Sequence, residues 1–283
     1  MVSTAVRIDP IRSALHIRVA AVMATLVAVF CMSTVSANAA PAGPTTIVLV
    51  HGAFADSSGW RDVAATLGAA GHPVQTFDNP LRGPTHDSAQ LEKQLATIRG
   101  PIVLVGHSYG GAVITNTHDP DVVANVYIAA FAPARGEFVQ GLLNPFVYPG
   151  SRLLPPALQL AIVEDQTGIG GYNLDGYIAE PYFHEIFAQD VDAPTAADMF
   201  AHQKSAALVA NLEPSGDPSW AKVPSWYLIS RQDQVIPPAL QRFMASRAAS
   251  GHTTEIDASH ASLVSRPGDV ATTILTAVAA TRG

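Results

Sequence analysis

The stretch VLVGHSYGGA, residues 103–112, places one serine among glycines directly after an apolar run. Gly106 and Gly110 lie two residues either side of Ser108. The apolar residues 102–105 predict a buried strand, and the residues after the serine predict a helix. A serine on such a tight strand-to-helix turn needs neighbours with little or no side chain. The stretch therefore predicts the central strand–turn–helix unit of a layered α/β fold.

Outside this stretch, short apolar runs alternate with helical patterns along the chain. Several of the runs are too uniformly apolar to have a face in solvent, which is typical of parallel strands covered on both sides. The alternation therefore predicts a mostly parallel central sheet with helices on both faces. The expected strands are 46–50, 74–77, 102–105, 125–129, 226–230 and 253–256, and the expected helices are 60–70, 87–98, 109–117, 237–249 and 269–280.

One segment, at about 134–218, interrupts this alternation. It has many prolines, no clear strand and a high aromatic content, including Phe138, Tyr148 and Phe183. A stretch this long between two strands is too large for a plain loop. We expect an inserted, mainly helical cap, in which most aromatics form the cap's own core and a few line a pocket.

The first 39 residues have the order of a secretory signal peptide. Three arginines precede an apolar stretch of about 14 residues, at 19–32, and small residues follow it. The stretch is shorter than the roughly 20 residues a membrane-spanning helix needs. We therefore expect a signal peptide at 1–39, a domain at 40–283 with no membrane span, and a secreted or periplasmic protein. The alternatives are a retained signal anchor, or acylation at Cys31, which follows Phe30 rather than a small residue.

The composition indicates a globular domain with an acidic surface. Of the 283 residues, 48% are hydrophobic, so a large core can be buried. Removal of residues 1–39 takes away three arginines and Asp9, leaving 13 basic and 22 acidic residues, a balance of −9. Such a surface repels nucleic acid and anionic membranes.

The only cysteine, Cys31, is removed with the signal peptide, so no disulfide is expected. The sequence does not predict the oligomeric state.

Residues 106–110 form a G-x-S-x-G pattern, which gains weight from the strand before it and the helix after it. In this position a serine lies at the carboxyl end of a central strand and at a helix N-terminus, whose amides favour negative charge. The simpler interpretation is a glycine-rich turn with an incidental serine. The context favours Ser108 as a nucleophile.

A serine nucleophile needs a histidine base and normally a carboxylate that orients it, both later in the chain for this topology. His260 follows the last predicted strand by a few residues, and Asp233 follows the preceding strand in the same way. We therefore predict a Ser108–His260–Asp233 triad. The less well placed candidates are His118, His184, His202 and His252 for the base, and Asp217 and Asp257 for the acid.

Acyl chemistry also needs amide donors for an oxyanion. The amide of Tyr109, after the serine, is the first candidate. The second comes from the loop that follows the strand at 46–50, where Ala53 or Phe54 can turn an amide inward, and we favour Ala53. We expect His51, at the base of that loop, to be structural.

These motifs resemble those of the α/β-hydrolase superfamily. Within it the chain is similar to bacterial carboxylesterases and to plant methyl-ester esterases related to hydroxynitrile lyases. The resemblance runs from Thr46 to the C-terminus and implies Ser108 as nucleophile, Asp233 as acid, His260 as base and the amides of Ala53 and Tyr109 as oxyanion hole. Cyanohydrin-cleaving relatives carry a lysine beside the histidine, where this chain has Ala261, and halide-cleaving relatives use an aspartate in place of the serine. Both activities are therefore disfavoured.

The sequence as a whole predicts a secreted serine hydrolase that cleaves small-molecule carboxylic esters through an acyl-serine intermediate. The chemistry requires no metal and no organic cofactor. Acyl transfer and cofactor-free perhydrolysis use the same triad and remain open, and a ligand-binding receptor that keeps the fold is a third alternative.

Overall fold

Six parallel strands form the central sheet, in the order β2-β1-β3-β4-β8-β9. The structure, a computed structural model, describes residues 43–281, so the predicted signal peptide lies outside the described residues. All six predicted strands are present, and the prediction of a mostly parallel sheet is confirmed. The strands are β1 (Thr46–Val50), β2 (Val74–Phe77), β3 (Ile102–His107), β4 (Val122–Ile128), β8 (Ser225–Ser230) and β9 (Thr253–Ile256).

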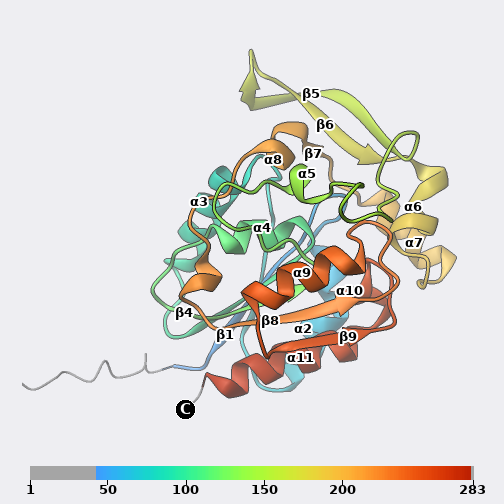
Figure 1. Cartoon of the computed structure of the whole chain (residues 1–283). Coiled ribbons are helices and arrows are strands. Elements are labelled where there is room, and N and C mark those ends of the chain that lie inside the picture. The colour runs from blue at the N-terminus through green and yellow to red at the C-terminus, as the bar shows by residue number, and fades with distance from the viewer. Residues whose placement is uncertain (1–42, 282–283) are drawn as a thin grey trace, which may run out of the picture. The chain divides into compact units, whose positions relative to one another are not determined.

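Helices cover both faces of this sheet, as the apolar strands require (Figure 1). Alternate residues of β1 show the two layers, since Ile47 and Leu49 pack into one core cluster while Val48 and Val50 pack into the other. The first cluster includes residues of α2 (Arg61–Ala69) and α11 (Pro267–Ala280). The second includes residues of α3 (Pro84–Leu95), α4 (Tyr109–Thr115) and α9 (Pro238–Ala248). Short helical turns η1 (Ser57–Trp60), η2 (Ser219–Ala221) and α10 (Ser262–Ser265) complete the layers.

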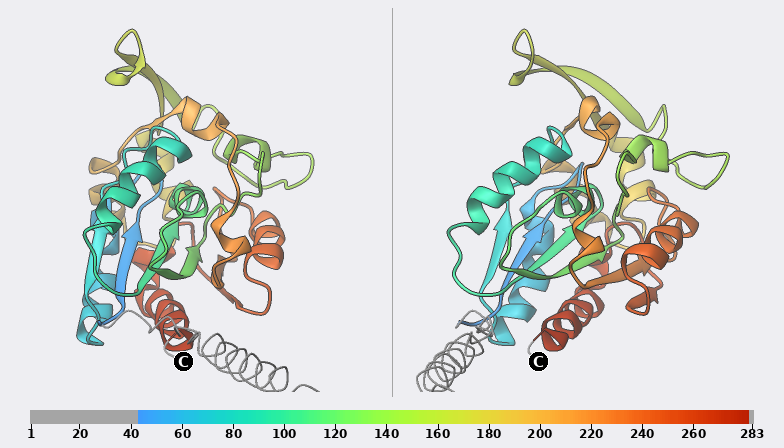
Figure 2. Two further views of the ribbon diagram at one scale, coloured as in Figure 1. Left: turned by 90° about the vertical axis from the view of Figure 1, so that its left-hand side faces the viewer. Right: turned by 60° about the vertical axis from the view of Figure 1, so that its left-hand side comes forward.

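The segment between β4 and β8 contains strands as well as helices, so the expectation of a cap without clear strands is wrong. Strand β5 (Leu158–Ile169) pairs antiparallel with β6 (Tyr172–Ile178), and both views of Figure 2 show this hairpin projecting from the body. Gly170 and Gly171 turn the chain with φ values of +64° and +87°, a conformation that glycine adopts without strain. A third strand, β7 (Ala206–Ala207), pairs with β6. The cap helices are α5 (Val139–Leu142), α6 (Glu180–Phe187), α7 (Ala193–Ala201) and α8 (Leu208–Leu212).

The parallel sheet places the loops that carry the predicted site on one edge. Ser108 directly follows β3, while Asp233 and His260 follow β8 and β9 by a few residues. Because the carboxyl ends of parallel strands share one edge, these side chains come together there.

In the part of the chain that the structure describes, no helix is both long and apolar enough to span a bilayer.

Candidate active site

Ser108 lies on a strained turn between β3 and α4. Its φ of +54° is unusual for a residue with a side chain and is typical of a sharp strand-to-helix turn that exposes a nucleophile. The glycines make the turn possible. A Cβ on Gly106 would lie 2.6 Å from the carbonyl oxygen of Gly110, and a Cβ on Gly110 would lie 2.5 Å from the carbonyl oxygen of Val50. Only glycine fits at either position.

The predicted serine, histidine and aspartate form a continuous hydrogen-bonded chain. His260 Nε2 lies 2.9 Å from Ser108 Oγ, and His260 Nδ1 lies 2.7 Å from Asp233 Oδ2. All three side chains are buried. Since a carboxylate can only accept, Nδ1 carries the proton of the neutral ring, and Nε2 is free to accept the proton of the serine hydroxyl. The geometry is that of a nucleophile, its base and the group that orients the base.

Besides His260, three donors hold the Asp233 carboxylate in place. The backbone N–H groups of Val235 and Ile236 donate to Oδ1 at 2.8 and 2.9 Å, and the side-chain amide of Gln241 donates to Oδ2 at 2.8 Å. Gln241 also donates to the carbonyl of Ile236 and accepts from the N–H of Ser230. It is fully buried in α9, and it ties that helix to the triad. Sequence analysis missed Gln241, because nothing in a single sequence distinguishes it from a surface glutamine.

His107, directly before Ser108, supports His260 through the backbone. Its Nε2–H donates to the carbonyl oxygen of His260 at 2.9 Å, and the two rings lie 4.7 Å apart. Burial lowers the pKa of His107 well below its usual value, and the neighbouring His260 ring lowers it further. His107 is therefore a neutral donor that fixes the loop carrying His260.

The loop after β1 brings the second predicted oxyanion donor to the serine. Ala53 and Tyr109 line the same pocket as Ser108. The N–H of Phe54 donates to the carbonyl of Lys204 at 3.1 Å, which leaves Ala53 as the better placed of the two alternatives. A Cβ on Gly52 would lie 2.6 Å from Ser108 Cβ, so this loop packs directly against Ser108.

A match to a family of known proteins agrees with this arrangement. Residues 47–273 match the model of the Alpha/beta hydrolase family. The chain belongs to this family. The match covers most of the chain and includes all five predicted site residues.

The relatives of this chain are named as hydrolases and esterases. The pyrethroid hydrolase of Sphingobium wenxiniae is 30% identical over 253 residues, which cover 81% of this chain and 86% of that protein. The carbendazim hydrolyzing esterase of Nocardioides sp. is 36% identical over 124 residues, which cover 36% of this chain and about half, 48%, of that protein. The crystal structure of a pyrethroid hydrolase from Sphingobium faniae has a TM-score of 0.69 at 25% identity and covers 84% of this chain and 98% of its own. The predicted resemblance is confirmed, and the chain is a hydrolase of the esterase type.

The less well placed candidates for the acid and the base have partners outside the site at Ser108. Asp257 forms an ion pair with Arg231 at the surface, and Asp217 pairs with Arg135. The ring of His252 stacks on Trp226, far along the sheet from the serine end of β3. Among the remaining histidines, His184 donates to the carbonyl of Val191, His202 contacts Asp198, and the N–H of His118 donates to Glu92.

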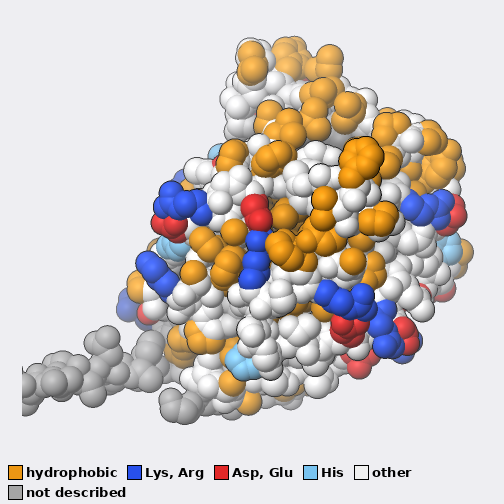
Figure 3. Space-filling view, in the orientation of Figure 1, with side chains coloured by type: hydrophobic (Ala, Val, Ile, Leu, Met, Phe, Trp, Pro, Cys, Tyr) orange, Lys and Arg blue, Asp and Glu red, His pale blue; other side chains and the backbone are white. Residues whose placement is uncertain are grey.

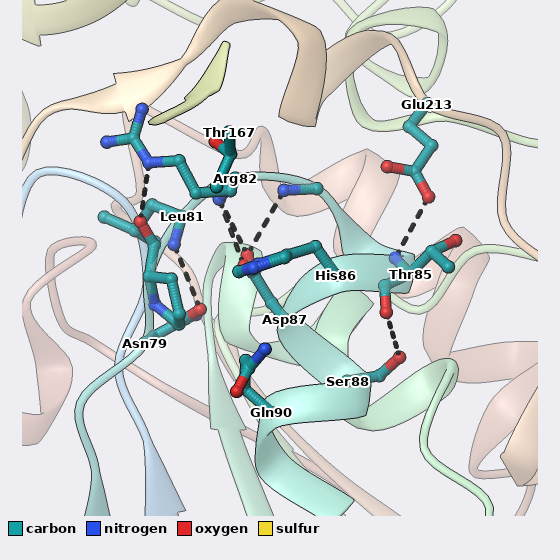
Figure 4. A network of polar contacts seen from close by, with 12 residues as sticks. Asn79, Leu81, Arg82, Thr85, His86, Asp87, Ser88, Gln90, Thr167 and Glu213 are labelled. Atoms are coloured by element: carbon teal, nitrogen blue, oxygen red, sulfur yellow. Dashed lines mark hydrogen bonds and ion pairs between the residues drawn. The ribbon is translucent and has the colours of Figure 1, made fainter. Parts of the chain in front are cut away.

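His51 and the side chain of Tyr109 also have structural partners. The Nε2 of His51 accepts the backbone N–H of Asn79, so the proton of its neutral ring lies on Nδ1, 2.9 Å from the carbonyl of Gly52. Burial lowers the pKa of His51. The hydroxyl of Tyr109 donates to the buried carboxylate of Asp87. Asp87 also accepts the backbone N–H of Arg82, as Figure 4 shows. Burial raises the pKa of Tyr109, so the phenol stays neutral.

The pocket at Ser108 lies between the sheet and the cap and is partly open to solvent. Phe54, Phe131 and Val235 form the sheet side, while Leu143 and Leu158 belong to the cap side. None of the described residues that line it is charged.

Within residues 43–281, no group of three or more histidine, cysteine, aspartate or glutamate side chains is placed to bind a metal ion.

Proposed function

We propose that this hydrolase cleaves uncharged carboxylic esters through an acyl intermediate on Ser108. The observation that carries the proposal is the unbroken chain from Ser108 Oγ through both nitrogens of His260 to Asp233, with distances of 2.9 and 2.7 Å. A serine hydroxyl is a poor nucleophile without such a base. His260 is that base, because its Nδ1–H donates to Asp233 and its Nε2 can accept the serine proton.

In the first half-reaction, His260 Nε2 takes the proton of Ser108 as Oγ bonds to the ester carbonyl carbon. The negative charge moves to the carbonyl oxygen, where the amides of Ala53 and Tyr109 stabilise it. The tetrahedral adduct then collapses, the bond to the alcohol oxygen breaks, and His260 passes its proton to the leaving alcohol. Asp233 stabilises the imidazolium that forms between these two transfers.

In the second half-reaction, water takes the place of the alcohol. His260 removes a proton from the water as its oxygen attacks the acyl carbon, and the second tetrahedral adduct uses the same two amides. His260 then protonates Ser108 Oγ as the acid leaves. The cycle restores the enzyme, and it requires neither a metal nor an organic cofactor.

The lining of the pocket supports an uncharged, apolar substrate. A charged acyl or alcohol group would lose its hydration there without gaining a counter-ion. The name of one relative, a carbendazim hydrolyzing esterase, agrees with an ester as the substrate. We therefore propose small-molecule esters with apolar parts on both sides of the carbonyl.

The test is hydrolysis of p-nitrophenyl esters by the wild type and by Ser108→Ala. We expect the wild type to cleave the acetate and butyrate esters. Ser108→Ala is expected to lose at least about 10³-fold in kcat with unchanged folding, because loss of a triad member leaves only the binding and oxyanion contributions. Equal rates in the two proteins would exclude Ser108 as the nucleophile.

We also propose that residues 1–39 direct export and are then removed. The support is the order of arginines, apolar stretch and small residues at this end of the sequence. Expression of the full chain in a bacterium that exports proteins, followed by N-terminal sequencing, tests this. A start near Asn38 or Ala40 in the periplasm or medium supports the proposal, and an intact chain in the cytoplasm contradicts it.

A further inference from the structure

The β5–β6 hairpin of the cap has two chemically different faces. Residues that pair across an antiparallel ladder point to the same face, and successive residues alternate between faces. The face that carries Ala161 and Val163 also carries Asp175 and Asn173. The pairs on the other face are Leu158 with Ile178, Leu160 with Gly176, Ile162 with Leu174, and Glu164 with Tyr172.

The polar face is fixed to the rest of the domain. Arg82, in the loop after β2, makes a bidentate ion pair with the buried carboxylate of Asp175, with both N···O distances 2.8 Å. The same guanidinium lies 3.0 Å from Asp165 Oδ2. The hydroxyl of Ser205 adds a hydrogen bond to Asp175. Because these contacts hold the polar face toward Arg82, the other face points away from it.

That other face is apolar and open. Leu160, Ile162, Tyr172 and Leu174, which we call the apolar hairpin face, are 49%, 77%, 51% and 41% exposed. Figure 3 shows hydrophobic side chains gathered over the hairpin and over the elements below it. Exposed apolar residues that are contiguous in this way mark a site for a ligand or a partner.

The residues next to the apolar hairpin face, on the same side of the ladder, line the pocket at Ser108. Leu158 and Gly176, which belong to the same face of the ladder, both line that pocket. A Cβ on Gly176 would lie 3.3 Å from Leu158 Cδ1 and 3.7 Å from Leu160 Cδ2. The leucine side chains therefore meet over the glycine, and Leu160 begins where the pocket wall ends.

The apolar hairpin face extends beyond the pocket and ends at the charged side chain of Glu164. With about 3.4 Å per residue, the Cα atoms of Leu158 and Ile162 are roughly 14 Å apart along the strand. Glu164 then replaces the aliphatic residues on this face. The surface thus suits an apolar chain that leaves the pocket and lies along the hairpin, and it does not suit a small ester, which ends inside the pocket.

We propose that the apolar hairpin face is a second binding region of the active site, which holds the far apolar part of a long, uncharged ester. This rests on the proposed function, since the ester carbonyl must lie at Ser108. Continuity with the pocket selects the substrate itself as the occupant, in preference to a second copy of the chain or a lipid surface.

The test compares p-nitrophenyl esters from acetate to dodecanoate, each below the concentration at which it aggregates, and the dodecanoate also above that concentration. A fully buried methylene is worth about fourfold in affinity, and one that is half covered on an open face is worth about twofold. We expect kcat/KM of the wild type to rise by about twofold per methylene once the chain leaves the pocket. Ile162→Ser with Leu174→Ser is expected to lower kcat/KM for the dodecanoate about tenfold, while the acetate, too short to reach the face, is cleaved at the wild-type rate.

Val163→Ser is the matched control. Val163 is adjacent to Ile162 on the same strand but points to the polar face, paired with Asn173. It is expected to leave the dependence on chain length unchanged. An equal loss in this variant would mean that the integrity of the hairpin matters rather than its apolar face, and would overturn the proposal.

Three other results would also overturn it, and they differ from a failure of the proposed function. If the acetate is cleaved in a Ser108-dependent way but the double variant treats all chain lengths as the wild type does, the face binds no substrate. If light scattering shows a dimer that the double variant dissociates, with equal losses for all esters, the face is a contact between copies. If the loss appears only above the concentration at which the dodecanoate aggregates, the face binds a lipid surface. Absence of any Ser108-dependent cleavage, by contrast, would contradict the proposed function itself.

Discussion

Gln241 is a positioning residue, and its replacement should affect stability and turnover in separable ways. Gln241→Met keeps the length of the side chain but removes its amide. The N–H of Ser230 loses its 3.1 Å bond to Gln241 Oε1, and the carbonyl of Ile236 loses a donor at 2.8 Å. Each buried polar group left without a partner costs about 1–3 kcal/mol. We therefore expect the free energy of unfolding to fall by about 3 kcal/mol, measured by urea denaturation.

The same substitution removes the donor to Asp233 Oδ2, the oxygen that also accepts from His260. The two backbone amides still hold Oδ1, so the carboxylate stays in the site but is less well oriented. A hydrogen bond to a charged group is worth about 1.5–3 kcal/mol, and part of this value is lost from the transition state. We expect kcat on a short p-nitrophenyl ester to fall about tenfold, which corresponds to about 1.4 kcal/mol, with KM unchanged.

Gln203→Met is the control for this experiment. Gln203 lies in the cap and makes two bonds to the backbone of Ile178, at 2.7 and 3.0 Å, away from the triad. It should lower stability without lowering kcat on the short ester. An unchanged kcat in Gln241→Met, or an equal fall in both variants, would refute the reasoning that Gln241 acts through Asp233.

Three further predictions concern the turn, the cap and acid stability. Gly52→Ala should lower kcat/KM about 100-fold, because the new Cβ displaces Ser108, whereas Gly68→Ala, with nothing within 4 Å in α2, should keep full activity in the same ester assay. Arg82→Met should lower the free energy of unfolding by about 3–5 kcal/mol, because Asp175 stays buried without its counter-charge, and adding Asp175→Leu should recover most of that loss in the same denaturation experiment. If the double variant is no more stable than the single one, the ion pair does not explain the loss. Below pH 6.5 the unfolded chain binds a proton at His107 that the folded chain does not, because burial lowers the folded pKa, so the free energy of unfolding should fall by up to about 1.4 kcal/mol per pH unit on acidification. Urea unfolding at neutral pH and at a series of lower values measures this slope, and stability that rises on acidification would contradict it.

The sequence predicts most of the sheet because its strands are buried on both faces. A short, uniformly apolar run such as 102–105 indicates a buried strand of a parallel sheet. The residues that follow such strands lie together at the carboxyl edge of the sheet. That is why Ser108, Asp233 and His260 could each be placed from the strand before it.

The cap was harder to predict, because it is organised by tertiary contacts. The sequence of β5 alternates poorly, because Ala161 and Val163 place apolar residues on the face that also carries Asp175. The carboxylate of Asp175 is paired with Arg82 from a distant loop, a contact that no local pattern reveals. Gly170 and Gly171 are a local signal for a turn, but two glycines alone do not distinguish a hairpin from a loop. Gln241 could not be found at all, since its role depends on the angle at which α9 returns to the triad.

The central claim is that Ser108 carries the acyl group, and covalent labelling tests it most directly. The wild type and Ser108→Ala are treated with a fluorophosphonate, which labels a serine activated by a neighbouring base, and are then digested and mapped by mass spectrometry. The account predicts one adduct per chain, on the peptide that contains residues 106–110, and no adduct in Ser108→Ala. Labelling at another residue, or an unlabelled wild type that is correctly folded, would contradict it.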